Sequence, residues 1–302
     1  MNPNFFIIGA PKTGTSSLAQ YLSDHDQVYF SNIKEPFFWC DDFKSAGHEF
    51  GVQSISKYLA LFEDATKQHI AVGEGSTRYL RSKNAVKNIL EFNPDSKFIV
   101  MLRNPVEVVQ AYHMEQKYSL HEDVEDFEDA WKLQEKRKMG QCLPRHCTEP
   151  LFLQYGHVCK YAEQLEYLFK TVSSEQVKIL IFDDFKKDTL GVYNETLEFL
   201  GLDCDGRIDF PVVNSAHKHR FSWLAALVLS PPNVIAPAVR AIRGWLIDNR
   251  FPLVEGFKRK LNSKVERKVI SEELKLDLQN YFRDDVAKLS KLLDRDLNHW
   301  LK

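Results

Sequence analysis

Four side chains that can bind an anion gather in one short turn near the start of the chain. Lys12 carries a positive charge, and Thr13, Thr15 and Ser16 carry hydroxyl groups. Gly14 lies among them, and because it has no side chain the backbone can approach a ligand closely there. A cation, several hydroxyl donors and a glycine in one turn are typical of phosphate-binding loops. The residue types therefore predict a site for a phosphate or a similar anion.

The segments on either side of the turn are expected to hold it in place. An apolar run from Phe5 to Ile8 predicts a buried strand before it, and Leu18 and Leu22 predict a helix after it. We expect Thr15 or Ser16 to cap this helix through its hydroxyl group. The first N–H groups of a helix have no carbonyl partner and point toward an anion placed there. A purely structural interaction module would leave this arrangement unexplained.

The spacing in the turn differs from that of the ATP-binding loop G-x-x-x-x-G-K-[ST]. Gly9 and Gly14 have the same separation, but Lys12 stands before the second glycine and Thr15 occupies the position of the lysine. The order PKTGTSSL is similar to the phosphosulfate loop of sulfotransferases that use 3′-phosphoadenosine 5′-phosphosulfate (PAPS). A kinase-like enzyme that uses ATP and magnesium is the alternative, and the position of Lys12 argues against it.

Further motifs follow in the order seen in the PAPS-dependent sulfotransferases, and they most resemble the bacterial and Golgi carbohydrate branch. The resemblance covers nearly the whole chain. It implies transfer of a sulfuryl group from PAPS to an acceptor hydroxyl by in-line displacement without a metal, with 3′-phosphoadenosine 5′-phosphate (PAP) as the product. The motifs are KEPFFW, GEGSTRYL, FIVMLRNPVE, ILIFDDFKKDT and RDLNHW.

The resemblance implies a role for each matched residue. Glu35 would be the general base for the acceptor hydroxyl, and we expect its aromatic neighbours to raise its pKa by excluding water. Lys12 would stabilise the charge on the leaving oxygen. Arg103 would bind the 3′-phosphate, because a guanidinium donates two parallel hydrogen bonds to such a group. The residues implied in cofactor binding are Lys12, Thr13, Gly14, Thr15, Ser16, Ser17, Arg103, Lys218 and Arg220.

Several of these residues also have an ordinary structural interpretation. Glu35 could be a surface acid paired with Lys34, and Arg103 could form an ion pair at a strand end. Lys218 and Arg220 could be plain surface charges. Only the match to the family motifs favours the functional interpretation of Glu35.

The chain departs from the family at three positions. Ala111 stands eight residues after Arg103, where the family has a serine that also holds the 3′-phosphate. This change removes a hydrogen bond to a charged group, worth about 1.5 to 3 kcal/mol, unless Gln110 or another neighbour substitutes. Phe37 and Gly75 stand where heparan-type relatives have a histidine and a lysine, so a heparan acceptor is not implied.

Two further interpretations follow from the site residues. A PAPS- or PAP-binding protein without catalysis is an alternative motivated by Ala111, against which the presence of Lys12 and Glu35 argues. The residues expected to line the acceptor site are Phe37, Glu74 and Tyr79.

Apolar runs alternate with amphipathic segments, which predicts an α/β fold with a P-loop-type parallel β-sheet flanked by helices. We expect an α/β core over 1–210 and a helical C-terminal extension over 211–302 without strands, together forming one domain. Ligands of such sheets bind beyond the carboxyl ends of the strands. The predicted strands are 5–8, 27–30, 69–73, 97–102 and 177–182, and the predicted helices include 58–62, 82–92, 105–118, 122–138, 155–172, 188–200 and 271–293.

Composition narrows the class of partner. The formal net charge of the 302 residues is −2, which gives no case for nucleic acid binding. The segment 214–268 nevertheless holds 11 Lys and Arg residues against three acids, so a local basic face could meet an anionic ligand. The ten histidines and five cysteines show no metal-binding spacing, and no metal is predicted. Reduced thiols and an N-terminus that enters a strand at once favour a cytoplasmic protein.

One apolar segment bears on the acceptor. Phe221 to Val239 is uncharged over 19 residues, but it contains Pro231, Pro232 and Pro237. Because proline interrupts a helix, we expect no transmembrane segment here. An apolar helix pair beside the acceptor site is the better interpretation. It leaves room for a carbohydrate, glycolipid or other lipidic alcohol as acceptor and for peripheral contact with a membrane.

Overall fold

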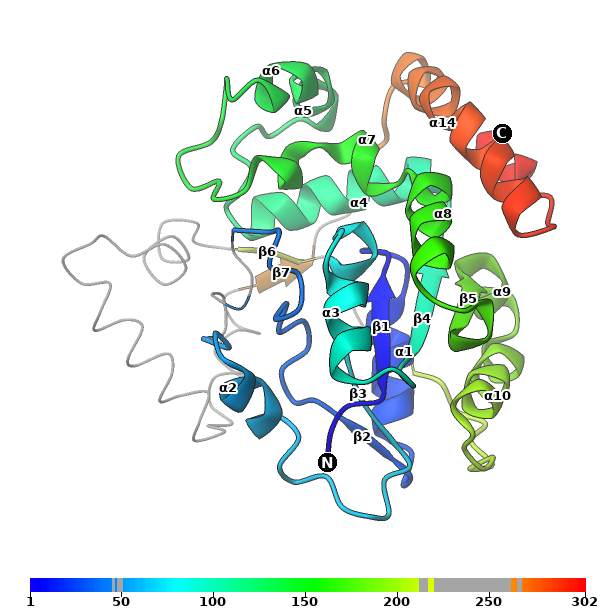
Figure 1. Ribbon diagram of the computed structural model, residues 1–302. Helices are drawn as coiled ribbons and strands as arrows, with labels where there is room; N and C mark the ends of the chain where they lie inside the picture. The colour runs from blue at the N-terminus through cyan, green and yellow to red at the C-terminus, as the bar shows by residue number, and fades with distance from the viewer. Residues whose placement is uncertain (45–46, 48–50, 212–216, 220–261, 265–267) are drawn as a thin grey trace. The chain divides into compact units, whose positions relative to one another are not determined.

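The computed structural model describes residues 1–44, 47, 51–211, 217–219, 262–264 and 268–302 (Figure 1). By its internal contacts the chain divides into two compact units. The first comprises 1–109, 156–214 and 275–302, and the second comprises 110–155 and 215–274. These units do not coincide with a division at residue 210, because the C-terminal segment belongs to the first unit.

The first unit is built on a five-stranded parallel sheet with the strand order β2-β3-β1-β4-β5. β1 is central, and all five of its residues are buried, as expected for a strand covered on both faces. The parallel sheet predicted from the alternation of elements is therefore confirmed. The strands are β1 Phe5–Gly9, β2 Val28–Phe30, β3 Ala71–Gly75, β4 Lys97–Leu102 and β5 Val177–Ile181.

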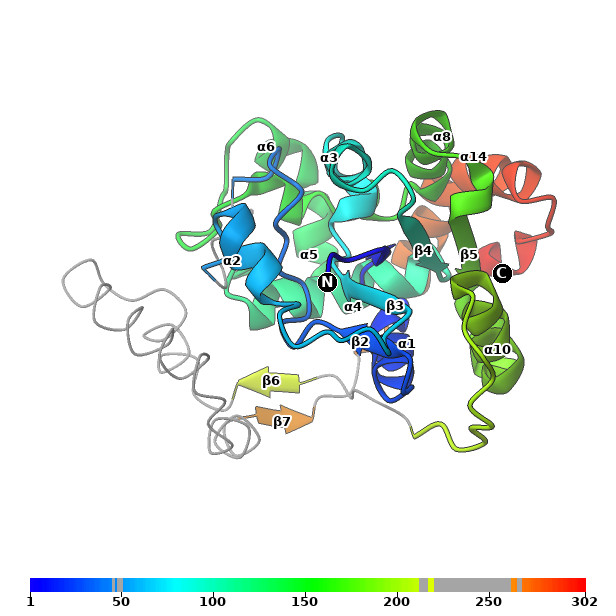
Figure 2. The same ribbon diagram turned by 60° about the horizontal axis from the view of Figure 1, so that its bottom comes forward.

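Helices cover both faces of this sheet. Figures 1 and 2 show α3 and α8 on one face and α1 and α10 on the other. Phe5 and Ile7 of β1 pack with α1 and α10, whereas Phe6 stacks on Phe98. The bounds are α1 Thr15–Ser23, α2 Ile55–Ala60, η1 Tyr79–Arg81, α3 Ala85–Phe92, α7 Tyr155–Val158, α8 Tyr161–Thr171, η3 Ser174–Gln176, α9 Phe182–Lys187, α10 Thr189–Leu200, α14 Glu272–Leu292 and η4 Asn298–Leu301.

The second unit surrounds a buried ion pair. Arg137 donates to both carboxylate oxygens of Glu122, at 2.5 and 2.7 Å, and the Tyr155 hydroxyl also donates to this carboxylate. Arg137 and Glu122 have no exposed side-chain surface. Its elements are most of α4 Pro105–Tyr118, with α5 Phe127–Lys132, α6 Gln134–Lys138, η2 Pro150–Leu153 and the antiparallel strands β6 His217–His219 and β7 Asn262–Lys264.

Several sequence-based boundaries were wrong. The helix expected over 155–172 is interrupted between α7 and α8, where the Gln164 amide donates to the carbonyls of His157 and Val158. The helix expected over 122–138 forms two short helices. Strands β6 and β7 occur where none was expected. The last predicted strand ends at Ile181, and Phe182 opens α9, which was not predicted.

Two general features of the described residues concern membranes and thiols. No helix in the described ranges combines the length and the apolar character needed to cross a bilayer. All five cysteines are free thiols, with Cys40 and Cys159 buried. The apolar segment 221–239 lies outside the described residues.

Candidate active site

The turn predicted to bind phosphate lies between β1 and α1, at the carboxyl end of the central strand. Gly14 has a φ of 99° and is the N-cap of α1. A Cβ atom on Gly14 would lie 2.9 Å from two ring atoms of Phe182 and 3.2 Å from the Met101 Sδ atom. The expectation that a hydroxyl of Thr15 or Ser16 caps the helix was wrong, because the helix begins directly after the left-handed glycine. This position therefore requires glycine for its backbone conformation and for its packing.

The remaining residues of the turn divide into a buried base and an exposed top. Thr13 is fully buried, and its hydroxyl donates to the Ala10 carbonyl at 2.7 Å. The Ala10 N–H in turn donates to the Met101 carbonyl of β4 at 2.8 Å, which attaches the turn to the sheet. Lys12 is exposed and has a φ of 61°. Lys12 therefore lies at the surface of a turn that is fixed from below.

The helix start supplies the other groups that the sequence assigned to the cofactor. Thr15 is buried, whereas Ser16 and Ser17 are partly exposed. The N–H groups of Ser17 and Leu18 donate to the Gly14 carbonyl, so they begin the helical hydrogen bonds. The N–H groups before them face the turn at the positive end of the helix dipole.

Arg103 follows β4, the neighbour of β1. Its guanidinium lies over the ring of Phe182, with Cζ 4.4 Å from the ring centroid. Nε donates to Glu107 at 2.9 Å, and the side chain retains 16% of its exposure. The ion pair that was the structural alternative for Arg103 is thus present, but Glu107 is about half exposed, and exposed pairs of this type contribute only about 0.3 to 0.5 kcal/mol. A phosphate group could therefore replace Glu107 as the partner of Arg103.

Glu35 lies in the loop that follows β2 and is partly exposed, with 27% of its side-chain surface accessible. Thr77 donates to its Oε1 atom at 2.8 Å, and the Lys34 ammonium lies 3.3 Å from the same oxygen. Glu35 and Phe37 both have positive φ values, 66° and 51°. A loop with two strained residues needs external contacts to hold its shape.

The pKa of Glu35 is lowered, which corrects the expectation that aromatic neighbours raise it. Burial does push the pKa upward, but Lys34, the Thr77 hydroxyl and the Arg78 guanidinium together outweigh that effect. The Phe37 ring stacks on Arg78, with Cζ 3.6 Å from its centroid. Glu35 is consequently ionised at neutral pH, the form that can accept a proton.

The three residues expected to line the acceptor site are all buried. Glu74 and Tyr79 have no exposed surface, and Phe37 retains 4%. Glu74 lies within β3 rather than after it, because this strand extends two residues beyond its predicted end. Burial raises the pKa of Glu74 to about 7, although hydrogen bonds from Tyr79, Ser76 and Tyr58 oppose the increase.

The structure adds residues that sequence reasoning missed. Ser76, Thr77 and Arg78 contact the Glu35 loop, and Phe182 lies against both Arg103 and Gly14, which the sequence assigned to the cofactor. The hydroxyl pair in GEGSTRYL was a usable signal for the first group. For the basic loop, Lys218 lies in β6 with its side chain not described, and Arg220 lies outside the described residues.

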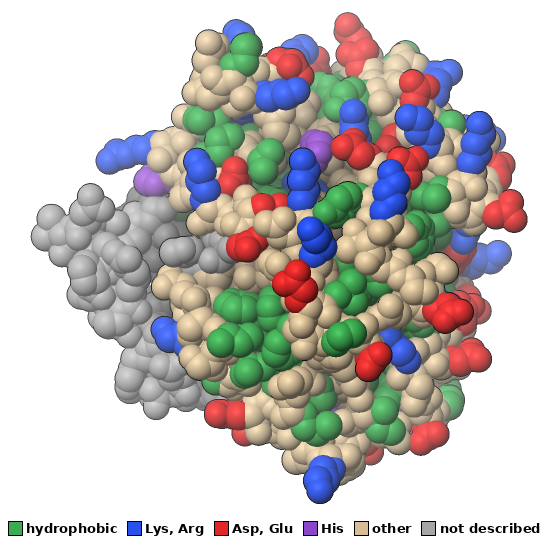
Figure 3. All heavy atoms as spheres, in the orientation of Figure 1, with side chains coloured by type: hydrophobic (Ala, Val, Ile, Leu, Met, Phe, Trp, Pro, Cys, Tyr) green, Lys and Arg blue, Asp and Glu red, His purple; other side chains and the backbone are tan. Residues whose placement is uncertain are grey.

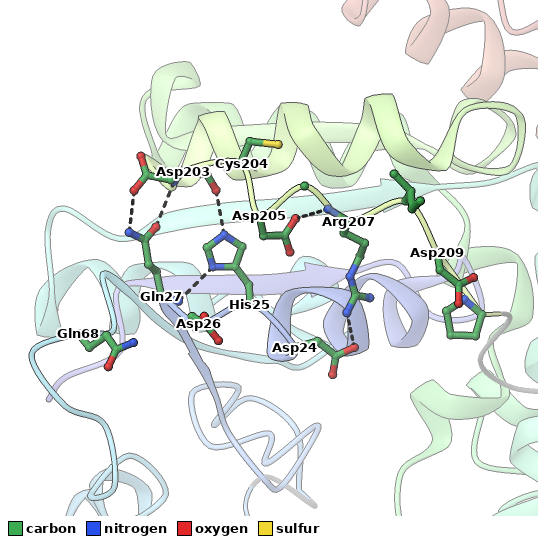
Figure 4. Close-up of a pocket in the computed structure, with 13 residues that line it drawn as sticks. Asp24, His25, Asp26, Gln27, Gln68, Asp203, Cys204, Asp205, Arg207 and Asp209 are labelled. Carbon is green, nitrogen blue, oxygen red and sulfur yellow. Dashed lines mark hydrogen bonds and ion pairs between the residues drawn. The ribbon is translucent and has the colours of Figure 1, made fainter.

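A large hollow lies at the amino-terminal ends of the strands, opposite the candidate site (Figure 4). Its volume is about 920 Å³, and its lining residues precede β2 and β3 or follow α10. Arg207 donates to Asp24 at 2.7 Å, and the ring of His25 lies 2.8 Å from the Asp203 carbonyl, so the lining is largely paired with itself. Since ligands of parallel sheets bind at the carboxyl ends, this hollow does not belong to the candidate site.

The face seen in Figure 3 shows no large patch of charge of one sign. Basic and acidic side chains are interspersed on that face. Within the described ranges, no three His, Cys, Asp or Glu side chains gather in a way that could hold a metal ion. The charged side chains that the sequence assigned to the chemistry are Lys12, Glu35 and Arg103.

Comparison with known proteins gives one consistent result. Residues 3–206 match a model of the family described as the sulfotransferase family. Mouse carbohydrate sulfotransferase 15 is 28% identical over 255 residues, which cover 66% of this chain and 44% of that protein. Mouse bifunctional heparan sulfate N-deacetylase/N-sulfotransferase 4 is 25% identical over 315 residues, covering 99% of this chain and 31% of that protein. The chain thus spans less than half the length of these curated relatives.

A solved structure is similar over the full length. The crystal structure of a sulfotransferase from Alicyclobacillus acidocaldarius matches with a TM-score of 0.72 and 26% identity, and the match covers 100% of both chains.

Proposed function

The chain belongs to the sulfotransferase family, and we propose that it transfers a sulfuryl group from PAPS to a hydroxyl group of a carbohydrate or glycolipid acceptor. One observation carries the proposal. The Lys12 turn, the Glu35 loop and Arg103 follow β1, β2 and β4 respectively. All three therefore lie at the carboxyl ends of the strands of one parallel sheet. The chemistry needs an anion cradle, a base and a second phosphate contact, and these three segments supply them.

The residues present fit PAPS. Gly14 adopts the left-handed conformation from which α1 begins, and the N–H groups at the start of that helix are the ones that a phosphate would bind. Arg103 offers its guanidinium for the 3′-phosphate. When bound, PAPS would supply an activated sulfuryl group.

The chain's own residues would do the rest. Glu35, ionised at neutral pH, accepts the proton of the acceptor hydroxyl while the new O–S bond forms and the S–O bond to the 5′-phosphate breaks. Lys12 balances the negative charge that appears on the departing phosphate oxygen. General base catalysis of this kind contributes about 10²- to 10⁴-fold to a rate.

The acceptor class rests on the relatives and on two residues. The names of the matched relatives describe a carbohydrate sulfotransferase and a heparan sulfate N-deacetylase/N-sulfotransferase. Phe37 and Gly75 remove polar groups that a heparan acceptor would be expected to contact, so we favour a different sugar hydroxyl or a glycolipid.

Calorimetric titration with PAP, and separately with ATP plus magnesium, tests the cofactor. We expect PAP to bind the wild-type protein, Arg103→Ala to weaken that binding at least about tenfold, and ATP to show no heat. Arg207→Ala removes an arginine near the amino-terminal ends of the strands, away from the candidate site, and serves as the matched control. Binding of ATP without PAP would reject the proposal in favour of a kinase-like enzyme.

A second experiment tests catalysis. The protein is incubated with ³⁵S-labelled PAPS and a panel of desulfated glycans and glycolipids. We expect label to enter at least one acceptor class with the wild type and none with Glu35→Gln. Tight PAP binding without transfer to any member of the panel would favour a PAP-binding protein without catalysis.

A further inference from the structure

A fully buried carboxyl group lies beside the candidate site without a role in the chemistry proposed above. The Oε1 atom of Glu74 accepts hydrogen bonds from the hydroxyls of Tyr79 at 2.7 Å and Tyr58 at 3.4 Å. Its Oε2 atom is buried and has no hydrogen-bond partner in the described part of the chain. Burying a carboxyl group costs free energy unless the group is hydrogen-bonded. The two hydrogen-bonded partners of Glu74, Tyr58 and Tyr79, therefore indicate its role.

Both tyrosines hold the loop that carries Glu35. The Tyr79 hydroxyl, which donates to Glu74, accepts a hydrogen bond from the backbone N–H of Trp39 at 3.4 Å. The ring of Tyr58 stacks on Phe38, with centroids 4.7 Å apart and an interplanar angle of 16°. It also meets the Trp39 ring edge-on at 5.1 Å. Glu74 therefore fixes the two side chains on which the end of this loop rests.

The residues that follow Glu74 hold the beginning of the same loop. The Phe37 N–H donates to the Ser76 hydroxyl at 3.1 Å, and Thr77 donates to Glu35 at 2.8 Å. The loop is thus attached at both ends to one short stretch of chain around β3. Because Glu35 and Phe37 have positive φ values, the loop is expected to relax if either attachment is lost.

We propose that Glu74 is a positioning residue for Glu35, and that through Tyr58 and Tyr79 it holds the segment 35–39 in the conformation in which Thr77 donates to the Glu35 carboxylate. The inference rests on the proposed function in one respect, the role of Glu35 as base. Its structural content, the dependence of Glu35 on Glu74, is separate and can be measured without an acceptor.

The surroundings of Glu74 indicate which replacement preserves this role. Tyr58 faces it from α2 and Tyr79 from η1, and the loop contributes the charge of Glu35 and the buried thiol of Cys40. The hydroxyl donors need an acceptor oxygen and not a negative charge. Glutamine retains that oxygen in nearly the same shape, whereas leucine removes it.

The test measures the pKa of Glu35 directly, by NMR titration of protein labelled with ¹³C at the glutamate carboxyl carbons. Glu35→Gln identifies the resonance. We expect the midpoint of Glu35 to stay below 4.5 in the wild type and in Glu74→Gln, and to rise toward that ordinary value in Glu74→Leu. Val72→Ala, on the same face of β3, controls for general loss of packing and should leave the midpoint unchanged.

Binding of PAP separates this inference from the proposed function. The wild type, Glu74→Gln, Glu74→Leu and Val72→Ala should bind PAP within about a factor of two of one another, because the hydrogen bonds that Glu74 accepts come from Tyr58 and Tyr79. An unchanged Glu35 midpoint in folded Glu74→Leu, or an equal rise in Val72→Ala, would overturn the inference and leave the proposed function intact. Failure of the wild type to bind PAP would overturn the function, while the NMR result would still decide the positioning role.

Discussion

The guanidinium of Arg103 lies over the ring of Phe182, and the same ring fills the space that a side chain on Gly14 would need. A single aromatic side chain at the start of α9 thus touches both elements that are proposed to bind the two ends of PAPS. The contact explains why the turn tolerates no side chain at Gly14.

Gly14→Ala should therefore impair both stability and binding. Alanine at a φ of 99° is strained by about 1 to 3 kcal/mol, and its Cβ would displace the Phe182 ring. We expect a lower free energy of unfolding in urea and a loss of PAP affinity of at least about tenfold by calorimetry. Gly201→Ala, at a φ of 78° with open space around it, should show the strain but normal PAP binding. Equal loss of affinity in both variants would argue against the role of the Phe182 contact.

The lowered pKa of Glu35 predicts the pH dependence of turnover. A general base must be ionised, so the acid limb of the kcat/KM profile should lie below pH 4.5. Above that pH, the ionisation of Glu35 should cause no further change in kcat/KM. Thr77→Val removes a hydrogen bond that lowers this pKa, so the acid limb should move upward. Thr171→Val, which removes a hydroxyl at the end of α8, should leave the profile unchanged. An acid limb that does not move in Thr77→Val would show that Thr77 does not stabilise the ionised base.

Glu74 should make the protein less stable as the pH rises. Its pKa is about 7 in the folded state and about 4.5 when exposed, so its stabilising contribution is complete below pH 4.5 and is lost as the pH rises to 7. The difference amounts to about 3 kcal/mol. Urea unfolding at pH 5 and pH 8 should show that Glu74→Gln gains stability relative to the wild type at the higher pH. A constant difference between the two proteins would contradict the raised pKa.

The buried pair in the second unit should dominate the stability of that unit. Arg137→Met leaves Glu122 buried without its partner, which costs about 3 to 5 kcal/mol. Lys132→Met breaks an exposed pair with Glu128 and should cost less than about 1 kcal/mol. Despite burial, Arg137 and its neighbours lower the pKa of Glu122, so the advantage of the wild type should shrink as the pH falls through that pKa. Thermal unfolding at pH 7 and pH 4 measures both effects.

Ala111→Ser tests the alignment of the 3′-phosphate site. Ala111 is buried in α4, eight residues after Arg103. If a serine there can donate to the phosphate, PAP should bind about tenfold more tightly, whereas adenosine 5′-phosphate should bind as before. Unchanged or weaker PAP binding would mean that this position is not the equivalent of the family serine.

The sequence was most informative where apolar runs were long and bounded. Lys97–Leu102 and Pro105–Tyr118 were predicted with the bounds that the structure has, because a buried strand, an Asn-Pro turn and a helix follow one another there. The end of β3 was misplaced, since Glu74 interrupts an apolar pattern although it is fully buried. Only hydrogen bonds from distant Tyr58 and nearby Tyr79 make that burial acceptable.

The electrostatics of the site could be derived only in part from neighbours in sequence. The aromatic residues beside Glu35 suggested a raised pKa, and Lys34 next to it opposes that effect. Thr77, which is 42 residues away in the chain, and Arg78 also lower the pKa, and their contacts with Glu35 could not be predicted from the sequence. Phe182 was invisible for the same reason, because its contacts with Gly14 and Arg103 join three segments far apart in sequence.

The position of β1 in the sheet also constrains how the protein can form during synthesis. β1 is made before its hydrogen-bonding partners, which are Gly73 to Gly75 on one side and Lys97 to Val100 on the other. The apolar strand and the turn behind it must therefore wait unpaired until β3 and β4 have left the ribosome. Pairings so distant in sequence form slowly, and exposed apolar strands invite aggregation in the meantime. Chaperone capture of nascent chains should accordingly be strongest before β4 emerges.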